Sequence, residues 1–151
     1  MQLRRDICLG SLANLPAESS GWRASIAARL GLLKELGYQG VVHWGDWALI
    51  HQAGLIPCGM ASIVDPAAAL DLAKQHRDAG LDFTTLHLGT GFESDAEMDA
   101  LAAAVIEATA QTGHALHVET HRATMTQDIR RTIDLIARFP ERSEEHTSEL
   151  Q

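Results

Sequence analysis

The chain has 151 residues, of which 46% are hydrophobic and 21% charged, a balance typical of a folded globular domain and not of a disordered chain. The net charge is -8, and a chain this acidic lacks the cationic surface that binding to a nucleic-acid backbone requires. We therefore expect no nucleic-acid partner. No apolar run approaches the roughly 18 residues of a membrane span, and Asp6 and Gly10 interrupt the N-terminal segment before a secretory core develops. We therefore expect a cytoplasmic protein with no membrane partner.

The pattern of the chain alternates between strand-like and helix-like segments. The short apolar segments predict strands, and each is followed by a segment with helical spacing of its apolar residues. In chain order, the predicted strand and helix pairs are 6–12 and 22–37, 38–44 and 47–53, 55–64 and 67–79, 82–89 and 94–113, and 114–121 and 124–140. Such alternation indicates βαβ units with a parallel sheet covered by helices.

The helix boundaries carry recognisable signals. We expect Asp46 and Asp65 to cap helices, and Ser94 with Glu97, like Thr124 with Gln127, has the spacing of a capping box. Glycines 37, 54, 80 and 113 end the first four helices, and Pro140 ends the last. In the last helix, one apolar face is predicted from Ile129, Ile133 and Ile136.

The number of units leaves the architecture open. A closed (β/α)8 TIM barrel needs eight strands, so five βα units form either an open doubly wound sheet or an incomplete barrel. Residues 142–151, RSEEHTSELQ, show no apolar period and resemble the translation of a common sequencing adapter. We therefore divide the chain into residues 1–141, the natural α/β part, and a non-native tail at 142–151.

Strand alternation singles out one group of polar side chains. In the fifth strand, Leu116 and Val118 should face the helices, which leaves His117, Glu119 and His121 on the other face. In the fourth strand, Thr84, Leu86 and Leu88 form the apolar face, and His87 lies on the other face. Because ligands bind at the carboxyl ends of parallel strands, we predict a site that contains His87, Glu119 and His121.

Glu119 is the strongest candidate in this group, since an inward carboxylate beside imidazoles is stabilised by a divalent metal. The alternative is a salt bridge to Arg122 or Arg130. Residues two apart on a strand stand about 7 Å apart and share a metal poorly. We therefore expect His121 to contact the substrate or to hydrogen-bond a metal ligand.

The remaining polar candidates are weaker. His43 either lines a pocket or is a hydrogen-bonded core residue, and His51 and His76 are expected to be solvated on helices. The glycines of residues 88–94 precede a helix and give a weak anion-binding signal. Cys8 and Cys58 have no metal-ligand spacing and are expected to be buried, reduced thiols.

The segment HVETHRATMTQDIRRTIDLIARFPE at 117–141 resembles the xylose isomerase-like TIM barrel superfamily, in its sugar phosphate isomerase/epimerase branch. The segments DFTTLHLGTG and LGYQGVVHW resemble its fourth and second strands. The resemblance implies that Glu119 binds a divalent metal (Mn, Mg, Co or Zn) and can act as an acid/base catalyst. His87 matches a position that often contacts substrate, and we count it with Glu119 among the catalytic residues. The resemblance also implies a sugar or keto-acid substrate. Apart from the resemblance, we assign substrate contacts to His121, Arg122 and His43.

The resemblance also implies an N-terminal fragment of a larger enzyme, since the other metal ligands of the family belong to strands that this chain lacks. We expect the fragment to be inactive, to hold no metal firmly and to self-associate through exposed sheet edges. Two alternatives remain: a barrel like the apurinic-site endonucleases, which the acidic charge disfavours, and a non-catalytic open α/β binding module.

Overall fold

The computed structural model describes residues 4–140, so the predicted tail at 142–151 lies outside the described residues. A five-stranded sheet forms its centre, with every neighbouring pair parallel. The strands are β1 (Asp6–Cys8), β2 (Gly40–His43), β3 (Ile56–Ile63), β4 (Phe83–Leu88) and β5 (Ala115–Val118). The predicted α/β class and the five βα units are confirmed.

Helices alternate with these strands along the chain. They are the short 3-10 helix η1 (Leu9–Leu12) and the α-helices α1 (Ile26–Glu35), α2 (Trp47–Gln52), α3 (Ala68–Asp78), α4 (Asp95–Thr112) and α5 (Ile129–Arg138). The first predicted strand is shorter than expected, because the chain turns into η1 directly after Cys8.

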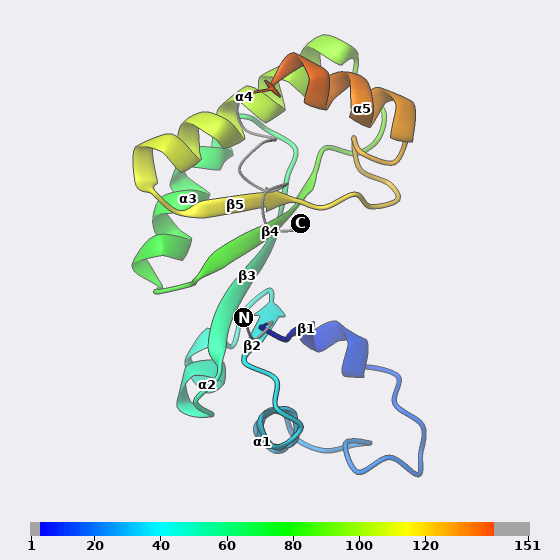
Figure 1. Cartoon of the computed structure of the whole chain (residues 1–151), viewed down its shortest axis with the longest axis vertical. Helices are drawn as coiled ribbons and strands as arrows, with labels where there is room; N and C mark the ends of the chain where they lie inside the picture. Colours follow the sequence, from blue (N-terminus) through cyan, green and yellow to red (C-terminus); the bar gives the residue numbers. More distant parts are fainter. Residues whose placement is uncertain (1–3, 141–151) are drawn as a thin grey trace.

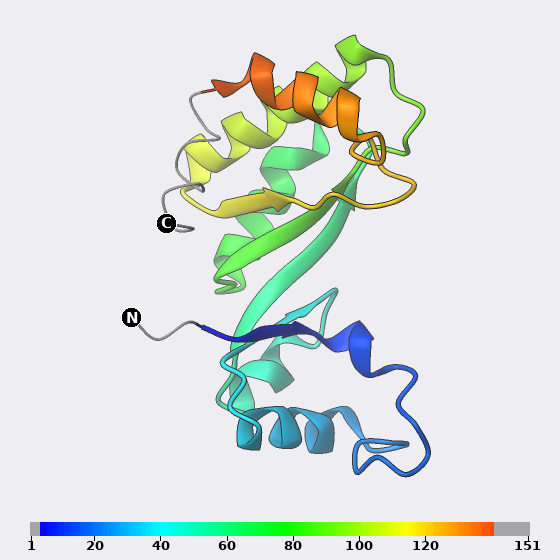
Figure 2. The same ribbon diagram turned by 45° about the vertical axis from the view of Figure 1, so that its right-hand side comes forward.

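The strand order decides between the two architectures. It is β1-β2-β3-β4-β5, so each crossover moves one position in the same direction across the sheet. Crossovers of one hand that never reverse direction place all their helices on one face, whereas a doubly wound sheet reverses at a switch point. Figure 1 and Figure 2 show the curved sheet with α1 and α2 beside its β1 end and α3, α4 and α5 beside its β5 end. The fold is a partial (β/α) barrel.

Two apolar clusters lie between the sheet and its helices. One joins Val41 of β2 to Leu30 and Leu33 of α1 and Ile50 of α2. The larger one joins β3 and β4 to α3 and α4; its most buried members are Leu86, Leu88, Met98 and Ala73. The predicted orientation of Leu86 and Leu88 toward the helices is therefore confirmed.

The capping predictions have mixed outcomes. The capping box of Ser94 and Glu97 is present at the start of α4. Asp46 precedes α2 in a left-handed conformation (φ 55°) and makes no capping bond. Asp65 accepts a bond from the Ala67 amide, although α3 begins at Ala68.

The predicted capping box of Thr124 and Gln127 is wrong, because the loop after β5 extends further than expected. Asp128 caps α5 through bonds from the amides of Arg130 and Arg131. The Thr124 hydroxyl donates to the His121 carbonyl, and the side-chain amide of Gln127 donates to the backbone carbonyl of Gly91 in the β4–α4 loop. These two side chains therefore shape the loop at the carboxyl end of the sheet.

Helix α5 turns its apolar stripe outward. Ile129, Ile133 and Ile136 are 65%, 58% and 50% exposed, while Thr132 and Leu135 are buried. Its contacts with α4 include two ion pairs, Arg131 with Asp95 and Arg138 with Asp99. Val118 of β5, predicted to be covered by helices, is 39% exposed because it lies on an edge strand.

The edges β1 and β5 are the two sides of the sheet on which the strands have no hydrogen-bonded neighbour within residues 4–140. Unpaired parallel edges can pair with further strands. Among the described helices, none has the length and apolar character of a membrane span.

Candidate functional site

The inner face of the curved sheet carries a hollow of about 450 Å³, lined by residues of β1, β2, β3 and β4 and of the segment that follows β5. The strand registers place Cys8 beside Val42, and Met60 beside Thr85, on this face. The lining residues are Cys8, Val42, Met60, Thr85, His87, Glu119 and His121. Apolar side chains come from β1, β2 and β3, whereas polar ones come from β4 and the segment after β5. The hollow therefore has an apolar half and a polar half.

His87 and Glu119 meet in the polar half, as strand alternation predicts. His87 Nε2 lies 3.2 Å from Glu119 Oε2, with the two side chains partly exposed. An ionised carboxylate only accepts hydrogen bonds, so Nε2 of His87 carries the hydrogen and donates it. Nδ1 of His87 makes no hydrogen bond within the described residues, and in a neutral ring it carries a lone pair. The proposed salt bridges of Glu119 with Arg122 or Arg130 do not occur among residues 4–140.

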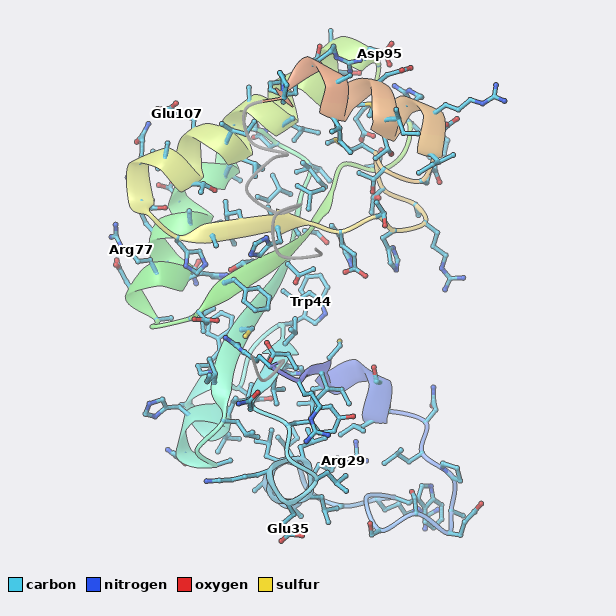
Figure 3. The ribbon with its side chains drawn as sticks, viewed as in Figure 1. Arg29, Glu35, Trp44, Arg77, Asp95 and Glu107 are labelled. Carbon is cyan, nitrogen blue, oxygen red and sulfur yellow. The ribbon has the colours of Figure 1, made fainter. Side chains whose placement is uncertain are left out.

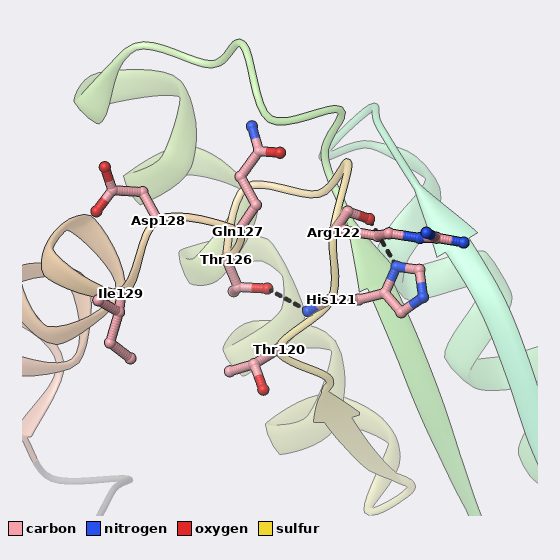
Figure 4. Close-up of a pocket in the computed structure, with 7 residues that line it drawn as sticks. All are labelled: Thr120, His121, Arg122, Thr126, Gln127, Asp128 and Ile129. Carbon is pink, nitrogen blue, oxygen red and sulfur yellow. Dashed lines mark hydrogen bonds between the residues drawn. The ribbon is translucent and has the colours of Figure 1, made fainter.

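His121 stacks on His87, with ring centres 4.4 Å apart and planes inclined by 18°. Its Nδ1 lies 2.6 Å from the Arg122 carbonyl oxygen, which can only accept, so Nδ1 carries a hydrogen. Nε2 makes no hydrogen bond among residues 4–140 and can accept one when it carries no hydrogen. Figure 4 shows the side chains of His121 and Arg122 on the same side of the loop, away from Thr120 and Ile129. The loop is held by the bond from the His121 amide to Thr126 Oγ1. The structure thus brings three predicted side chains together and Arg122 alongside them.

His43 is the predicted site residue that the structure places elsewhere. It pairs in register with Gly59, and Gly59 with Thr84, so it lies on the helix-covered face of the sheet. Its Nδ1 lies 2.7 Å from the Gly45 carbonyl oxygen, and its own carbonyl accepts from the Trp47 indole. His43 therefore shapes the β2–α2 loop, which agrees with a hydrogen-bonded histidine and not with a pocket residue.

Trp44, the next residue, lies on the site side and was missed by the sequence analysis. Its ring makes an edge contact with His87, with centroids 5.8 Å apart. Strand parity was the available signal: if His43 faces the helices, the following side chain faces the hollow.

The glycine-containing loop after β4 does not offer its amides to an external anion. Glu93 accepts bonds from the amides of Thr90 and Gly91 and from the Thr90 hydroxyl. Partial burial opposes ionisation of Glu93, but these bonds outweigh it and lower the pKa of its carboxyl. The amides that the sequence suggested for binding an anion therefore bind the carboxylate of Glu93 instead.

His76 contradicts its predicted exposure. It is buried, and its Nδ1 lies 2.7 Å from Thr84 Oγ1, which lies 2.8 Å from Nε2 of buried His114. Burial lowers the pKa of both imidazoles, and the neighbouring His114 lowers that of His76 further. This trio lies on the helix side of the sheet and belongs to the core. His51, by contrast, is exposed as predicted.

The amino end of the inner face is closed by Arg4. Its guanidinium pairs with Asp6 and Asp82 and lies 3.4 Å from Sγ of buried Cys58. Burial raises the pKa of Cys58 to about 11, so this thiol is unreactive at neutral pH. Both cysteines are free, and Cys8 is only partly buried.

The metal predicted from the resemblance has an incomplete set of ligands here. Among residues 4–140, no group of three or more His, Cys, Asp and Glu side chains is arranged to hold a metal ion. Glu119 and the free Nε2 of His121 are two potential donors, and a catalytic metal generally needs about three protein ligands. The described site is therefore suited to proton transfer but does not fit a resident metal by itself.

Comparison with known proteins adds no assignment to this geometry. No protein-family model, no curated protein and no solved structure matches the chain significantly. The resemblance to the xylose isomerase-like superfamily accordingly stays a prediction.

Proposed function

We propose that residues 1–141 are the N-terminal part of a (β/α)8 barrel enzyme, an isomerase or epimerase that moves a proton next to a carbonyl group. The observation that carries this proposal is the His87–Glu119 pair at the carboxyl end of β4 and β5, inside a hollow of small-molecule size. A carboxylate that accepts a bond from an imidazole is a suitable base for a carbon-bound proton.

The roles of the residues follow from their free atoms. Glu119 takes the proton, while His87 donates to its carboxylate and holds it in place. The free Nε2 of His121 accepts a substrate hydroxyl, and Arg122, on the same side of the loop, contacts an anionic or carbonyl group. A divalent metal in the whole enzyme would polarise the carbonyl oxygen, and strands beyond this chain would have to supply most of its ligands.

The partners proposed for this protein are a sugar or keto-acid substrate and, for the isolated chain, a second copy through the sheet edges. The acidic charge supports the absence of nucleic acid, and we place the protein in the cytoplasm. The sequential strand order favours the partial barrel over an open binding module, since helices cover only one face of the sheet.

The test compares Glu119→Gln with Glu107→Gln, the same substitution on the exposed surface of α4. Isomerisation of sugars and keto acids is assayed in the full-length parent with and without a chelator. We expect Glu119→Gln to lower kcat by about 100-fold or more, Glu107→Gln to have no effect and the chelator to abolish activity. Near-normal activity of Glu119→Gln would show that Glu119 is a structural residue. The present chain, assayed alone, should show no turnover.

A further inference from the structure

Glu119 and His121 both lie beyond the end of the strand that leads to them. β5 ends at Val118, and the last register pair with β4 joins Val118 to Leu86. Glu119 keeps one bond to that strand, from its amide to the Leu86 carbonyl at 3.0 Å. Within residues 4–140, no backbone bond joins His121 to β4, so a side chain has to hold its backbone in line with that of Glu119.

The side chain that does this is the hydroxyl of Thr126, a residue only 6% exposed. Thr126 Oγ1 lies 2.9 Å from the Glu119 carbonyl oxygen and 3.2 Å from the His121 amide nitrogen. A carbonyl oxygen only accepts and an amide N–H only donates, so the hydroxyl donates to Glu119 and accepts from His121. One side chain thus bridges the backbones of the two residues on either side of Thr120, and Figure 4 shows the bond to His121 as a dashed line.

Thr126 is itself fixed to β4, the strand that carries His87. The amide of the preceding Met125 donates to the Leu88 carbonyl at 2.8 Å, and the Met125 side chain is buried. On the other side of Thr126, Gln127 Nε2 donates at 3.0 Å to a backbone carbonyl of the loop that follows β4. The position of Thr126 is therefore set by the same strand on which His87 lies.

The rest of this loop is also held in a defined conformation. Arg131, in the first turn of α5, donates through Nη2 to Asp95 Oδ1 at 2.8 Å, and Figure 3 shows Asp95 beside α5. Ala123 has a φ of 57°, a left-handed conformation that is unfavourable for a residue with a side chain. Its amide donates to Gln127 Oε1 at 3.2 Å. A strained backbone that its surroundings hold in place is common at functional sites.

We propose that Thr126 is a positioning residue, whose hydroxyl holds the backbones of Glu119 and His121 so that their side chains converge on His87. The converged geometry consists of the 3.2 Å bond from His87 Nε2 to Glu119 Oε2 and the stack of the His87 and His121 rings at 4.4 Å. Without the hydroxyl, the segment after Val118 loses the bridge that fixes these two side chains relative to each other. This inference rests on the proposed function, because Glu119 and His121 carry the proposed proton transfer and substrate contact.

The first experiment measures the geometry of this chain by NMR and requires no turnover. Thr126→Val keeps the shape of the side chain but removes the hydroxyl, whereas Thr126→Ser keeps the hydroxyl. The matched control is Thr120→Val, the same substitution on the exposed residue between Glu119 and His121. Nuclear Overhauser contacts between the His87 and His121 rings should be present in the unmodified chain, in Thr126→Ser and in Thr120→Val, and lost in Thr126→Val.

Hydrogen exchange of the unmodified chain keeps the test decisive if Thr126→Val does not fold. The His121 amide should exchange slowly because Thr126 Oγ1 accepts its hydrogen, whereas the Thr120 amide, which has no acceptor among residues 4–140, should exchange fast. Fast exchange of both amides would overturn the proposal. A folded Thr126→Val that keeps the ring contacts would also overturn it, because Thr126 would then stabilise the loop without positioning the site.

The second experiment measures the chemistry in the full-length parent. Thr126→Val should lower kcat by about 10–100-fold, because a misplacement of about 1 Å has an effect of this size. Thr126→Ser should recover most of the lost activity, and Thr120→Val should have no effect; a normal kcat for Thr126→Val would overturn the proposal. Failure of the proposed function is distinguishable, because isomerisation would then be absent or independent of Glu119, while the ring contacts in this chain would still depend on Thr126.

Discussion

Thr84 of β4 and His114, which precedes β5, are joined inside the core by a 2.8 Å hydrogen bond between Oγ1 and Nε2. The same hydroxyl binds Nδ1 of His76 on α3 at 2.7 Å, so one threonine links two imidazoles from different elements. A hydroxyl has one hydrogen and two lone pairs, so it donates to at most one of the two rings and accepts from at least one of them. No buried side-chain nitrogen or oxygen of the described residues lacks a partner.

Replacement of Thr84 by valine should destabilise the fold. The substitution keeps the shape but leaves a ring nitrogen of both His76 and His114 without a partner, at a cost of about 1–3 kcal/mol. The matched control is Thr85→Val on the opposite face of the same strand, which should change the free energy of unfolding by no more than about 0.5 kcal/mol. Urea denaturation measures both, and equal effects would contradict the role of the trio.

Stability should fall in mild acid because the pKa values of His76 and His114 are lowered by burial. When the pH falls below 6.5, the ordinary pKa of histidine, the unfolded chain binds protons that the folded protein excludes. The free energy of unfolding therefore decreases as the pH falls. Above 6.5 both states are neutral and this contribution is fully present. We expect His114→Gln to flatten the dependence between pH 7 and about pH 5, when stability is measured at each pH.

Exposed His51 supplies the control for this titration. His51→Gln removes an imidazole from the surface of α2, so the pH dependence of stability should match that of the unmodified chain. A flattening equal to that of His114→Gln would show that the acid sensitivity does not come from the buried pair.

The outward isoleucine stripe of α5 should contribute to association and not to folding. Ile133→Lys should leave the free energy of unfolding within about 0.5 kcal/mol, because the side chain is exposed. Leu135→Ala, on the buried face of the same helix, should cost about 2–5 kcal/mol. Sedimentation at rising concentration should show association of the unmodified chain and less association of Ile133→Lys; a loss of stability in Ile133→Lys would place the stripe in the core.

Weak metal binding by the isolated chain should depend on Glu119. Because Glu119 and His121 are the only two donors of this site among the described residues, we expect low affinity for Mn²⁺, reduced at least about tenfold by Glu119→Gln. Titration calorimetry compares this variant with Glu107→Gln, which removes the same charge from α4. Equal affinity in the two variants would mean that the ion binds diffusely to an acidic protein.

Deletion of residues 142–151 tests the assignment of the tail as foreign. We expect the free energy of unfolding to change by no more than about 0.5 kcal/mol, because a non-native extension has no designed contacts. Thermal and urea denaturation of the two chains provide the comparison, and a loss of several kcal/mol would show that the tail belongs to the fold.

The sequence by itself determined the features that depend on local repetition. The alternation of strand and helix patterns predicted five βα units, and the two-residue period of strands predicted that His87 and Glu119 share a face. The capping box of Ser94 and Glu97 was predictable for the same reason, since its two partners are three residues apart.

The tertiary structure decided everything that depends on which elements become neighbours. His51 and His76 both lie on helices, but only His76 packs against the sheet, where Thr84 can bind it. The stripe of α5 has ideal helical spacing, yet it faces outward because α5 buries its other face, which carries Thr132 and Leu135. Periodicity determines which residues share a face, whereas burial depends on the long-range packing that covers that face. The contact of Trp44 with His87 across an intervening strand also depends on long-range packing.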